Sequence, residues 1–161
     1  MPHDPSIDAI RSGFIEQTGL ITQVEGLPRI AGRVFGMLIF DGEAIAFADL
    51  ATHLQVSRAS ISTSVRLLEE RGLVRRLTKP GERQDYFQLA PAPYATMLEG
   101  LSRRTRATRD QIGQTIDALP PQADAVGRLT AYADFYAALD GAVSTALDSL
   151  KTETPPKGPA R

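Results

Sequence analysis

The sequence predicts a mainly α-helical protein that carries one small β-hairpin. Apolar residues recur every three to four positions over most of the chain, which is the period of an amphipathic helix. One stretch alternates weakly between apolar and polar residues and is interrupted by Pro80-Gly81, as in a hairpin. Gly and Pro residues separate these segments. A chain of 161 residues is long enough for one compact domain with appended helices.

The first two helices follow from apolar spacing. Ile7, Ile10, Phe14 and Ile21 share one side of a helix over residues 6–24. Within the segment 1–25, this helix is our candidate for dimerisation. Gly26 ends it, and Pro28 suits the first position of a second helix over residues 28–40. The second helix is apolar on most sides, so we expect it to be buried.

A short helix, a tight break and a second helix come next. The short helix begins at Phe47, the break lies at Gln55-Val56, and Ser57 is a good N-cap for the following helix. Gly72 is a plausible residue just past its end. Residues 73–79 and 86–89 then form the hairpin. Helix, turn, helix and hairpin in this order predict a winged helix-turn-helix, which we assign to residues 26–90 as a DNA-binding domain.

Two long helices complete the predicted fold, over residues 92–118 and 122–150. The last helix has apolar residues at alternating steps of three and four: Leu129, Tyr132, Tyr136, Leu139, Val143, Ala146 and Leu150. Such a seam packs against another helix, either within the chain or in a dimer. We assign residues 91–150 to dimerisation. Residues 151–161 are rich in Pro and Gly, and we expect a disordered tail there.

Composition excludes several classes of protein. The total of 18 Lys and Arg against 19 Asp and Glu is unlike a histone-type basic protein. The absence of Cys excludes disulfides, thiolate metal sites and a cysteine nucleophile. With only His3 and His53, a His-rich zinc centre is out of reach, and we expect no metal and no cofactor. Paired acids in a pocket-like context, a Ser-His-Asp arrangement and a phosphate loop are also missing, so we expect no enzyme and no catalytic residue.

The sequence shows no membrane or export signal. The longest apolar run, Val34 to Phe40, is far shorter than the roughly 20 residues of a membrane helix. The first ten residues contain no apolar core of a signal peptide. We therefore expect a cytoplasmic protein that does not contact a membrane.

The near-neutral total charge hides a strong local imbalance. Residues 57–109 contain 11 basic and 5 acidic residues, whereas residues 110–150 contain 6 acidic residues and one Arg. Neutralisation of phosphates supplies much of the affinity of proteins for DNA, so the basic region is the part expected to bind it.

The second helix of the helix-turn-helix has a face suited to DNA. Arg58, Ser62, Thr63 and Arg66 share its outer side with Ala59. Short hydroxyl side chains and arginines fit a major groove about 12 Å wide. Ser and Thr are poor helix formers, so their concentration here has little value for stability alone. At the hairpin tip, Lys79 and Arg83 flank a flexible glycine and can approach the phosphate backbone or the minor groove.

For other arginines the sequence leaves two roles open, contact with DNA or a side chain on the protein surface. Arg75 and Arg76 point to opposite faces of a strand, so at most one of them reaches DNA. The group between Arg103 and Arg109 spreads around its helix, which favours a solvated face or contacts with acids of the last helix such as Asp140.

Two further arginines lie one helical turn apart at the start of the second helix. Arg29 and Arg33 either touch the DNA backbone or pair with the nearby acids Glu25 and Asp41.

Several segments together resemble the GbsR-like branch of the MarR transcriptional regulators, over about residues 26–90. The segments are Gly26-Leu27-Pro28-Arg29-Ile30-Ala31-Gly32-Arg33, Leu50-Ala51, Val56-Ser57-Arg58-Ala59-Ser60-Ile61-Ser62, Leu68-Glu69-Glu70-Arg71-Gly72-Leu73-Val74 and Gly81-Glu82-Arg83-Gln84-Asp85-Tyr86-Phe87. The resemblance implies a homodimer, a helical frame with two winged helices, and repression or activation at a palindromic operator on double-stranded DNA. It also implies a response to small molecules bound near the junction with the dimer helices, where aromatic residues are expected to serve either in packing or in holding a quaternary ammonium group.

The resemblance also implies roles for single residues. It implies that Arg83 is the DNA-contacting residue of the wing and that Glu82 or Asp85 holds it in place. One position departs from the pattern: Gln55 stands at the turn where Gly is usual, and a left-handed backbone there costs on the order of 1 kcal/mol. The complete set of candidate DNA-binding residues is Ser57, Arg58, Ser60, Ser62, Thr63, Arg66, Lys79 and Arg83.

A second function competes with DNA binding. Winged helices also serve as docking modules for proteins, and the basic middle of the chain would then meet an acidic protein partner. Charge reversal at Arg58 and Arg66 discriminates the two, because it abolishes DNA binding but spares a hydrophobic contact with a protein.

Overall fold

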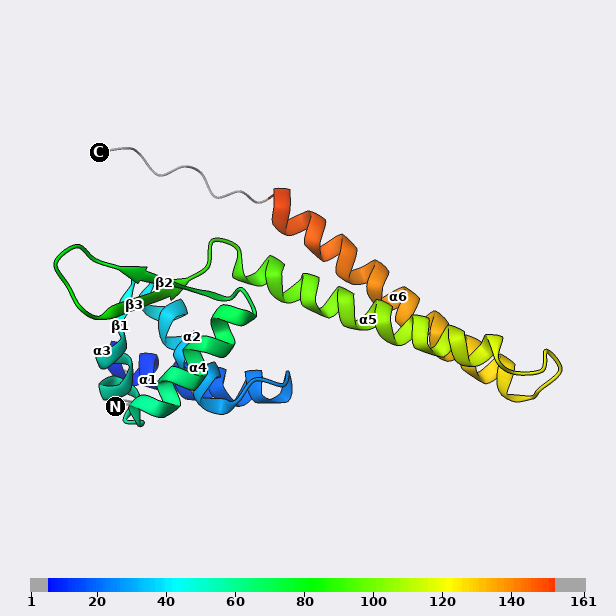
Figure 1. Cartoon of the computed structure of the whole chain (residues 1–161), viewed down its shortest axis with the longest axis horizontal. Coiled ribbons are helices and arrows are strands. Elements are labelled where there is room, and N and C mark those ends of the chain that lie inside the picture. Colours follow the sequence, from blue (N-terminus) through cyan, green and yellow to red (C-terminus); the bar gives the residue numbers. More distant parts are fainter. Residues whose placement is uncertain (1–5, 153–161) are drawn as a thin grey trace, which may run out of the picture. The chain divides into compact units, whose positions relative to one another are not determined.

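The computed structural model describes residues 6–152 and confirms a mainly helical fold with a small antiparallel sheet (Figure 1). The chain divides into two compact units, one ending at Pro93 and the other beginning at Tyr94. The first unit contains α1 (Ile7–Val24), α2 (Arg29–Asp41), β1 (Ile45–Ala46), α3 (Phe47–Leu54), α4 (Arg58–Glu70), β2 (Val74–Thr78) and β3 (Asp85–Leu89). The second unit contains α5 (Pro93–Asp117) and α6 (Ala125–Thr152). Within these residues, no helix is long and apolar enough to cross a membrane.

α2 is the central helix of the first unit, as its apolar sequence predicted. Val34, Phe35, Met37 and Leu38 are buried. α1 packs closely on one side of it because glycines stand at the crossing: a Cβ atom added to Gly36 would lie 2.8 Å from the Cβ atom of Thr18. The helix begins at Arg29, one residue later than expected, because Pro28 is the N-cap with an extended backbone.

The helix-turn-helix is formed by α3 and α4, with the turn at the predicted break. Gln55 has a left-handed backbone with φ of 53°. Ser57 caps α4, and its side-chain oxygen accepts a hydrogen bond from the backbone N–H of Ser60 at 3.1 Å. Leu50 on α3 and Ile61 on α4 are fully buried, and they hold the two helices together. Gly72, with φ of 70°, directly follows the C-cap of α4.

The wing is a three-stranded sheet rather than the two-stranded hairpin that was expected. Its strand order is β1-β3-β2, and Ile45 of β1 pairs with Phe87 of β3. β2 and β3 pair antiparallel from Val74 opposite Leu89. β1 was not predicted, because a strand of two residues has no readable periodicity. β1 leads directly into α3, so it joins the base of the wing to the helix-turn-helix.

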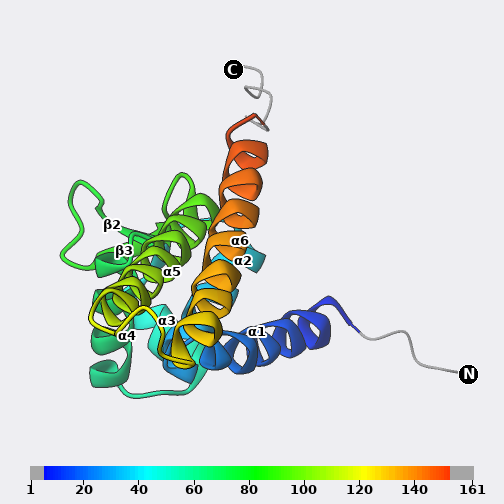
Figure 2. The same cartoon turned by 90° about the vertical axis from the view of Figure 1, so that its right-hand side faces the viewer.

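The second unit is a hairpin of two long helices (Figure 1, Figure 2). Five of the seven residues of the predicted seam are half-buried or buried: Leu129, Tyr136, Leu139, Val143 and Ala146. Asp140 lies beside them and is also half-buried. Tyr132 and Leu150 of that seam are 49% and 37% exposed. The fold of this chain therefore covers most of the predicted seam and leaves these two residues exposed.

The first two residues of the predicted tail are helical instead. α6 continues to Thr152, so residues 151–152 are helical. The rest of that prediction, residues 153–161, lies outside the described residues.

Candidate nucleic-acid interface

α4 separates a buried face from a polar one. Ile61, Val65 and Leu68 point into the core of the first unit. Arg58, Ser62, Thr63 and Arg66 are exposed, and Ser60 is half-buried at the edge of this face. The five side chains offer hydroxyl groups and guanidinium groups to solvent, which are donors suited to base edges and phosphates.

The start of α4 is held in place by local contacts. The hydroxyl groups of Ser57 and Ser60 lie 2.9 Å apart. The Arg58 guanidinium lies over the ring of Phe47, 4.9 Å from its centroid. Stacking on the ring restricts the Arg58 side chain while leaving its N–H groups directed around the rim. Ser57 is exposed, so its hydroxyl serves both the cap and the surface.

The tip of the wing is ordered around Tyr86. The Tyr86 hydroxyl donates a hydrogen bond to the Glu82 carboxylate, which raises the pKa of Tyr86. The Lys79 ammonium lies 3.9 Å from the centroid of the Tyr86 ring. Gly81, with φ of 82°, makes the turn between them. The candidate Lys79 therefore forms part of the framework of the wing.

Arg83 is not held as the resemblance implied. Glu82 binds Tyr86, and Asp85 forms an ion pair with Arg76 at 3.1 Å. Both acids are occupied by other partners because strand pairing places Arg76 and Tyr86 closer to them. Among the described residues, Arg83 has no ion pair, and it projects from an ordered turn.

Arg76 joins the end of α4 to the wing. Two of its nitrogens donate to the two carboxylate oxygens of Glu69 at 3.2 and 3.1 Å, and a third donates to Asp85 at 3.1 Å. The hydrogen bonds to Glu69 are the main cause of the raised pKa of Arg76. Its guanidinium also lies 5.3 Å from the ring centroid of Phe87. This link between recognition helix and wing was missed, because only strand register brings the residues together.

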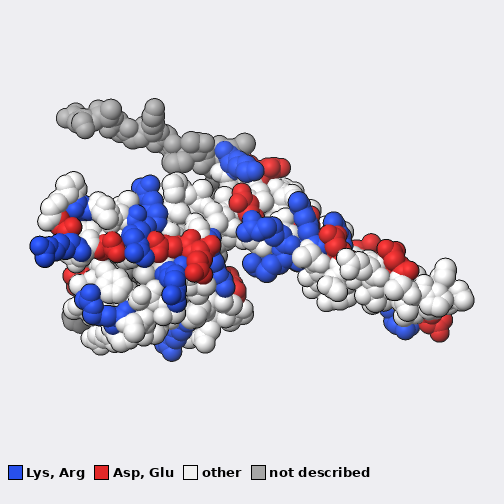
Figure 3. All heavy atoms as spheres, in the orientation of Figure 1, with Lys and Arg blue, Asp and Glu red and all other residues white. Residues whose placement is uncertain are grey.

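Basic residues outnumber acidic ones over α4 and the wing, residues 57–89. Figure 3 shows basic side chains spread over its visible face, with acidic side chains between them. Glu69, Glu82 and Asp85 are all engaged in bonds within the fold. Arg66 and Arg83, by contrast, have no bonded partner within residues 6–152. Their charge is available to an external anion such as phosphate.

Arg29 and Arg33 do not pair with Glu25 and Asp41. Both bind Glu16 of α1, at 3.0 and 2.6 Å, and Arg33 also donates to the backbone carbonyl of Leu54 at 3.1 Å. Asp41 is occupied by Arg11 of α1, with two bonds of 2.6 Å. The packing of α1 across α2 supplies these partners, which are distant in sequence. Arg33 thereby supports the end of α3 next to the turn.

The arginines of α5 divide between the two expected roles. Arg106 donates to Asp140 of α6 at 2.8 Å, and Ser102 donates to the same carboxylate at 2.6 Å. Arg109 pairs with its neighbour Asp110. Arg103 and Arg104 are exposed. Among the described residues, no three potential metal ligands come together.

Comparison with known proteins gives the class of the fold and of this surface. A model of the MarR family matches residues 25–84, which contain α2, the helix-turn-helix and strands β1 and β2 of the wing. The chain is 34% identical over 145 residues to the HTH-type transcriptional regulator MmpR5 of Mycobacterium tuberculosis (strain ATCC 25618 / H37Rv), covering 88% of this chain and 87% of that protein. A crystal structure described as a transcriptional regulator is 32% identical, with a TM-score of 0.71 over 89% of this chain and 99% of the other.

These similarities define a winged-helix transcriptional regulator that binds DNA and is not an enzyme. The chain belongs to the MarR family.

Proposed function

We propose that this protein is a homodimeric, sequence-specific regulator that binds a palindromic operator through α4 and the wing. The exposed face of α4, with its hydroxyl groups and the unpaired Arg66, is the observation that supports this most strongly. In this proposal Ser57, Arg58, Ser60, Ser62, Thr63 and Arg66 face the major groove. Arg83 contacts the backbone or the minor groove, and Lys79 contributes charge from its position over Tyr86.

Exposed apolar side chains support the dimer. On α1, Ile7, Ile21 and Val24 are 75%, 58% and 91% exposed. On α6, Tyr132 and Phe135 are 49% and 58% exposed, on the stripe that α5 leaves uncovered. Apolar stripes of this length on long helices are typical of subunit interfaces. We assign residues 1–25 and 91–150 to the dimer and 26–90 to DNA binding. Two recognition helices roughly 34 Å apart then require an inverted repeat.

Two segments of the sequence support a particular branch of the MarR family. The Gly-Leu-Pro-Arg segment before α2 and the Gly-Glu-Arg segment of the wing support placement in the GbsR-like branch. A regulator of this kind acts where the DNA is, so we place it in the cytoplasm. We also propose that DNA binding responds to a small molecule, and a groove beside α4 supports this.

Binding to the DNA upstream of the protein's own gene tests the proposal. Fluorescence anisotropy at several salt concentrations should give a log–log slope near −0.9 per phosphate contacted. Arg83→Ala should weaken binding to all sequences by a similar factor. Changes at Ser62 or Thr63 should alter the base preference instead. Lys151→Ala, at the exposed end of α6 and outside the residues assigned to the dimer, is the matched control and should bind normally.

The competing function is a protein-docking module. The double variant Arg58→Glu, Arg66→Glu should lose DNA binding while it keeps its fold and its dimer. An affinity for DNA that is independent of salt, or equal in this variant and the native protein, would refute the proposed function.

A further inference from the structure

The last carbonyl group of α3 lies where the chain turns into α4. Leu54 is the final residue of α3, and Gln55 follows it with a left-handed backbone. The next two backbone amides both donate further back along α3, at 3.2 and 3.1 Å. The Leu54 carbonyl therefore needs a donor from another element, and it lies at the end of a helix that carries a partial negative charge.

Arg33 of α2 supplies this donor. Its Nη2 atom donates to the Leu54 carbonyl at 3.1 Å. A cation at the C-terminus of a helix interacts favourably with the helix dipole, so Arg33 caps α3 from a neighbouring helix. Its side chain is 19% exposed, so most of the side chain is removed from water and held by its surroundings.

α1 holds Arg33 in this position. The Arg33 Nε atom lies 2.6 Å from a carboxylate oxygen of Glu16. Gly19 leaves the space that the stem of Arg33 occupies, because a Cβ atom added to this glycine would lie 2.7 Å from the Arg33 Cγ atom. One side chain of α2 is therefore fixed between α1 and the end of α3, which lie far apart in the sequence.

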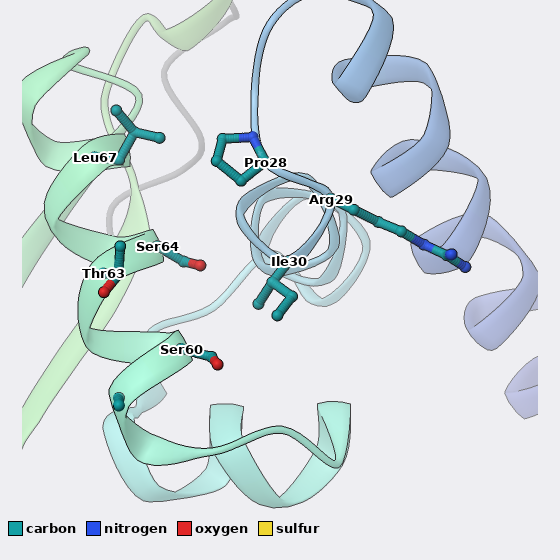
Figure 4. A pocket seen from close by; sticks show the side chains of 8 residues that line it. Pro28, Arg29, Ile30, Ser60, Thr63, Ser64 and Leu67 are labelled. Carbon is teal, nitrogen blue, oxygen red and sulfur yellow. The ribbon is translucent and has the colours of Figure 1, made fainter.

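Arg29 provides an internal comparison, because it shares the partner Glu16 but not the contact with Leu54. Its Nη2 atom lies 3.0 Å from the other carboxylate oxygen of Glu16. Arg29 also lines a groove of about 510 Å³ between α2 and α4, as does Ser64. Its side chain points away from that groove, towards α1 (Figure 4). Within residues 6–152, Arg29 makes no hydrogen bond to α3.

We propose that Arg33 is a positioning residue for DNA binding, which holds the turn before α4 and is itself held by Glu16 of α1. Without the hydrogen bond to Leu54, the end of α3 is released and the turn at Gln55 populates other arrangements. Only molecules with α4 in place bind the operator, so the apparent affinity falls with their fraction. Arg33 acts through the backbone rather than on a phosphate, because Glu16 and Leu54 occupy its guanidinium.

Hydrogen exchange of the full-length protein without DNA tests the cap. In Arg33→Met, the amides of Gln55 and Val56 should exchange about tenfold faster than in the native protein, the value of one hydrogen bond to a charged group. Arg29→Met should leave both rates unchanged. Glu16→Gln, at a surface position where the fold is least at risk, should accelerate them by a smaller factor. Native rates in both Arg33→Met and Glu16→Gln overturn the proposal.

The effect on DNA rests on the proposed function, and fluorescence anisotropy with the DNA upstream of the gene tests it at a temperature where every variant is folded. Arg33→Met should raise the Kd about threefold to tenfold more than Arg29→Met, which removes the same charge. The log–log salt slope should keep its native value, because no phosphate contact is lost.

Two results with DNA overturn the positioning role. A salt slope smaller by about 0.9 in Arg33→Met means that Arg33 itself touches a phosphate. A lower melting temperature with an unchanged Kd means that Arg33 serves stability alone. Faster exchange at the turn in Arg33→Met, together with no DNA binding by the native protein, would refute the proposed function and leave the cap intact.

Discussion

Replacing Arg76 by Met removes the side chain that joins the recognition helix to the wing. The Arg76 side chain is 47% exposed, and those of Glu69 and Asp85 are 27% and 40% exposed. Exposed ion pairs contribute about 0.2–1 kcal/mol each, and an exposed cation–π contact about 0.5 kcal/mol. The two pairs and the Phe87 contact therefore amount to about 1–2 kcal/mol of folding free energy, which urea unfolding measures.

The effect on DNA binding has a separate origin. Without Arg76, two carboxylates at the end of α4 and on β3 lose their counter-charge. A carboxylate about 8 Å from a phosphate in water is repelled by roughly 0.5 kcal/mol. Two such repulsions, about 1 kcal/mol together, raise the Kd for DNA by roughly fivefold. A looser wing lowers the affinity for DNA further. Fluorescence anisotropy at low salt is the appropriate assay, because screening reduces the difference.

A second substitution makes this reasoning refutable. Glu69→Gln in the native background breaks the link but also removes a negative charge, so these opposite effects should leave DNA affinity within about twofold of the native value. In the Arg76→Met background, the same change removes an unpaired negative charge and should restore part of the affinity. If Glu69→Gln changes DNA affinity by the same factor in both backgrounds, Arg76 does not act through Glu69.

Three further predictions concern the crossing of α1 and α2, the turn of the helix-turn-helix, and the ion pair between α5 and α6. Gly32→Ala should lower stability by about 1–3 kcal/mol in urea unfolding, because the new Cβ atom meets Thr22 and lies 2.9 Å from the Cα atom of Gly19. Gly13→Ala, which faces open space in α1, should instead be neutral or slightly stabilising. Gln55→Gly should relieve up to about 1 kcal/mol of backbone strain at the turn and raise Tm, and an unchanged or lower Tm would show that no strain is stored there. The Ser102 and Arg106 hydrogen bonds lower the pKa of Asp140. This contribution to stability is therefore present above the unfolded-state pKa and is lost as pH falls through the lower folded-state value. Asp140→Asn should flatten that acid limb of the Tm profile, and an identical limb would contradict the assignment.

Local chemistry made much of the DNA-binding unit predictable. Ser57 caps α4 because a serine oxygen can reach an amide three residues ahead, and this reach does not depend on the rest of the fold. The turn at Gln55 and the end of α4 at Gly72 also depend only on residues close in the sequence. The outer face of α4 follows from the 3.6-residue period once Ile61, Val65 and Leu68 are assigned to the core. Sequence therefore determined which side chains α4 presents.

Contacts between segments distant in the sequence needed the tertiary structure. Glu16 is the partner of Arg29 and Arg33 only because α1 crosses α2 at glycines. Arg76 meets Glu69 and Asp85 through strand register and the return of the chain from α4. Neither partner can be chosen from spacing, because many acids lie at comparable separations along the chain.

On α6, the heptad spacing identified most of the covered residues, but Tyr132 and Leu150 of that seam are exposed. The spacing also did not show that the charged Asp140 lies beside the covered residues, where Ser102 and Arg106 of α5 bind it. Ser64 is a second case, since the helical period predicts a core position for it but not the groove that it lines. Periodicity reports the direction of a side chain from its own helix, whereas the neighbour it meets is decided by how the helices pack.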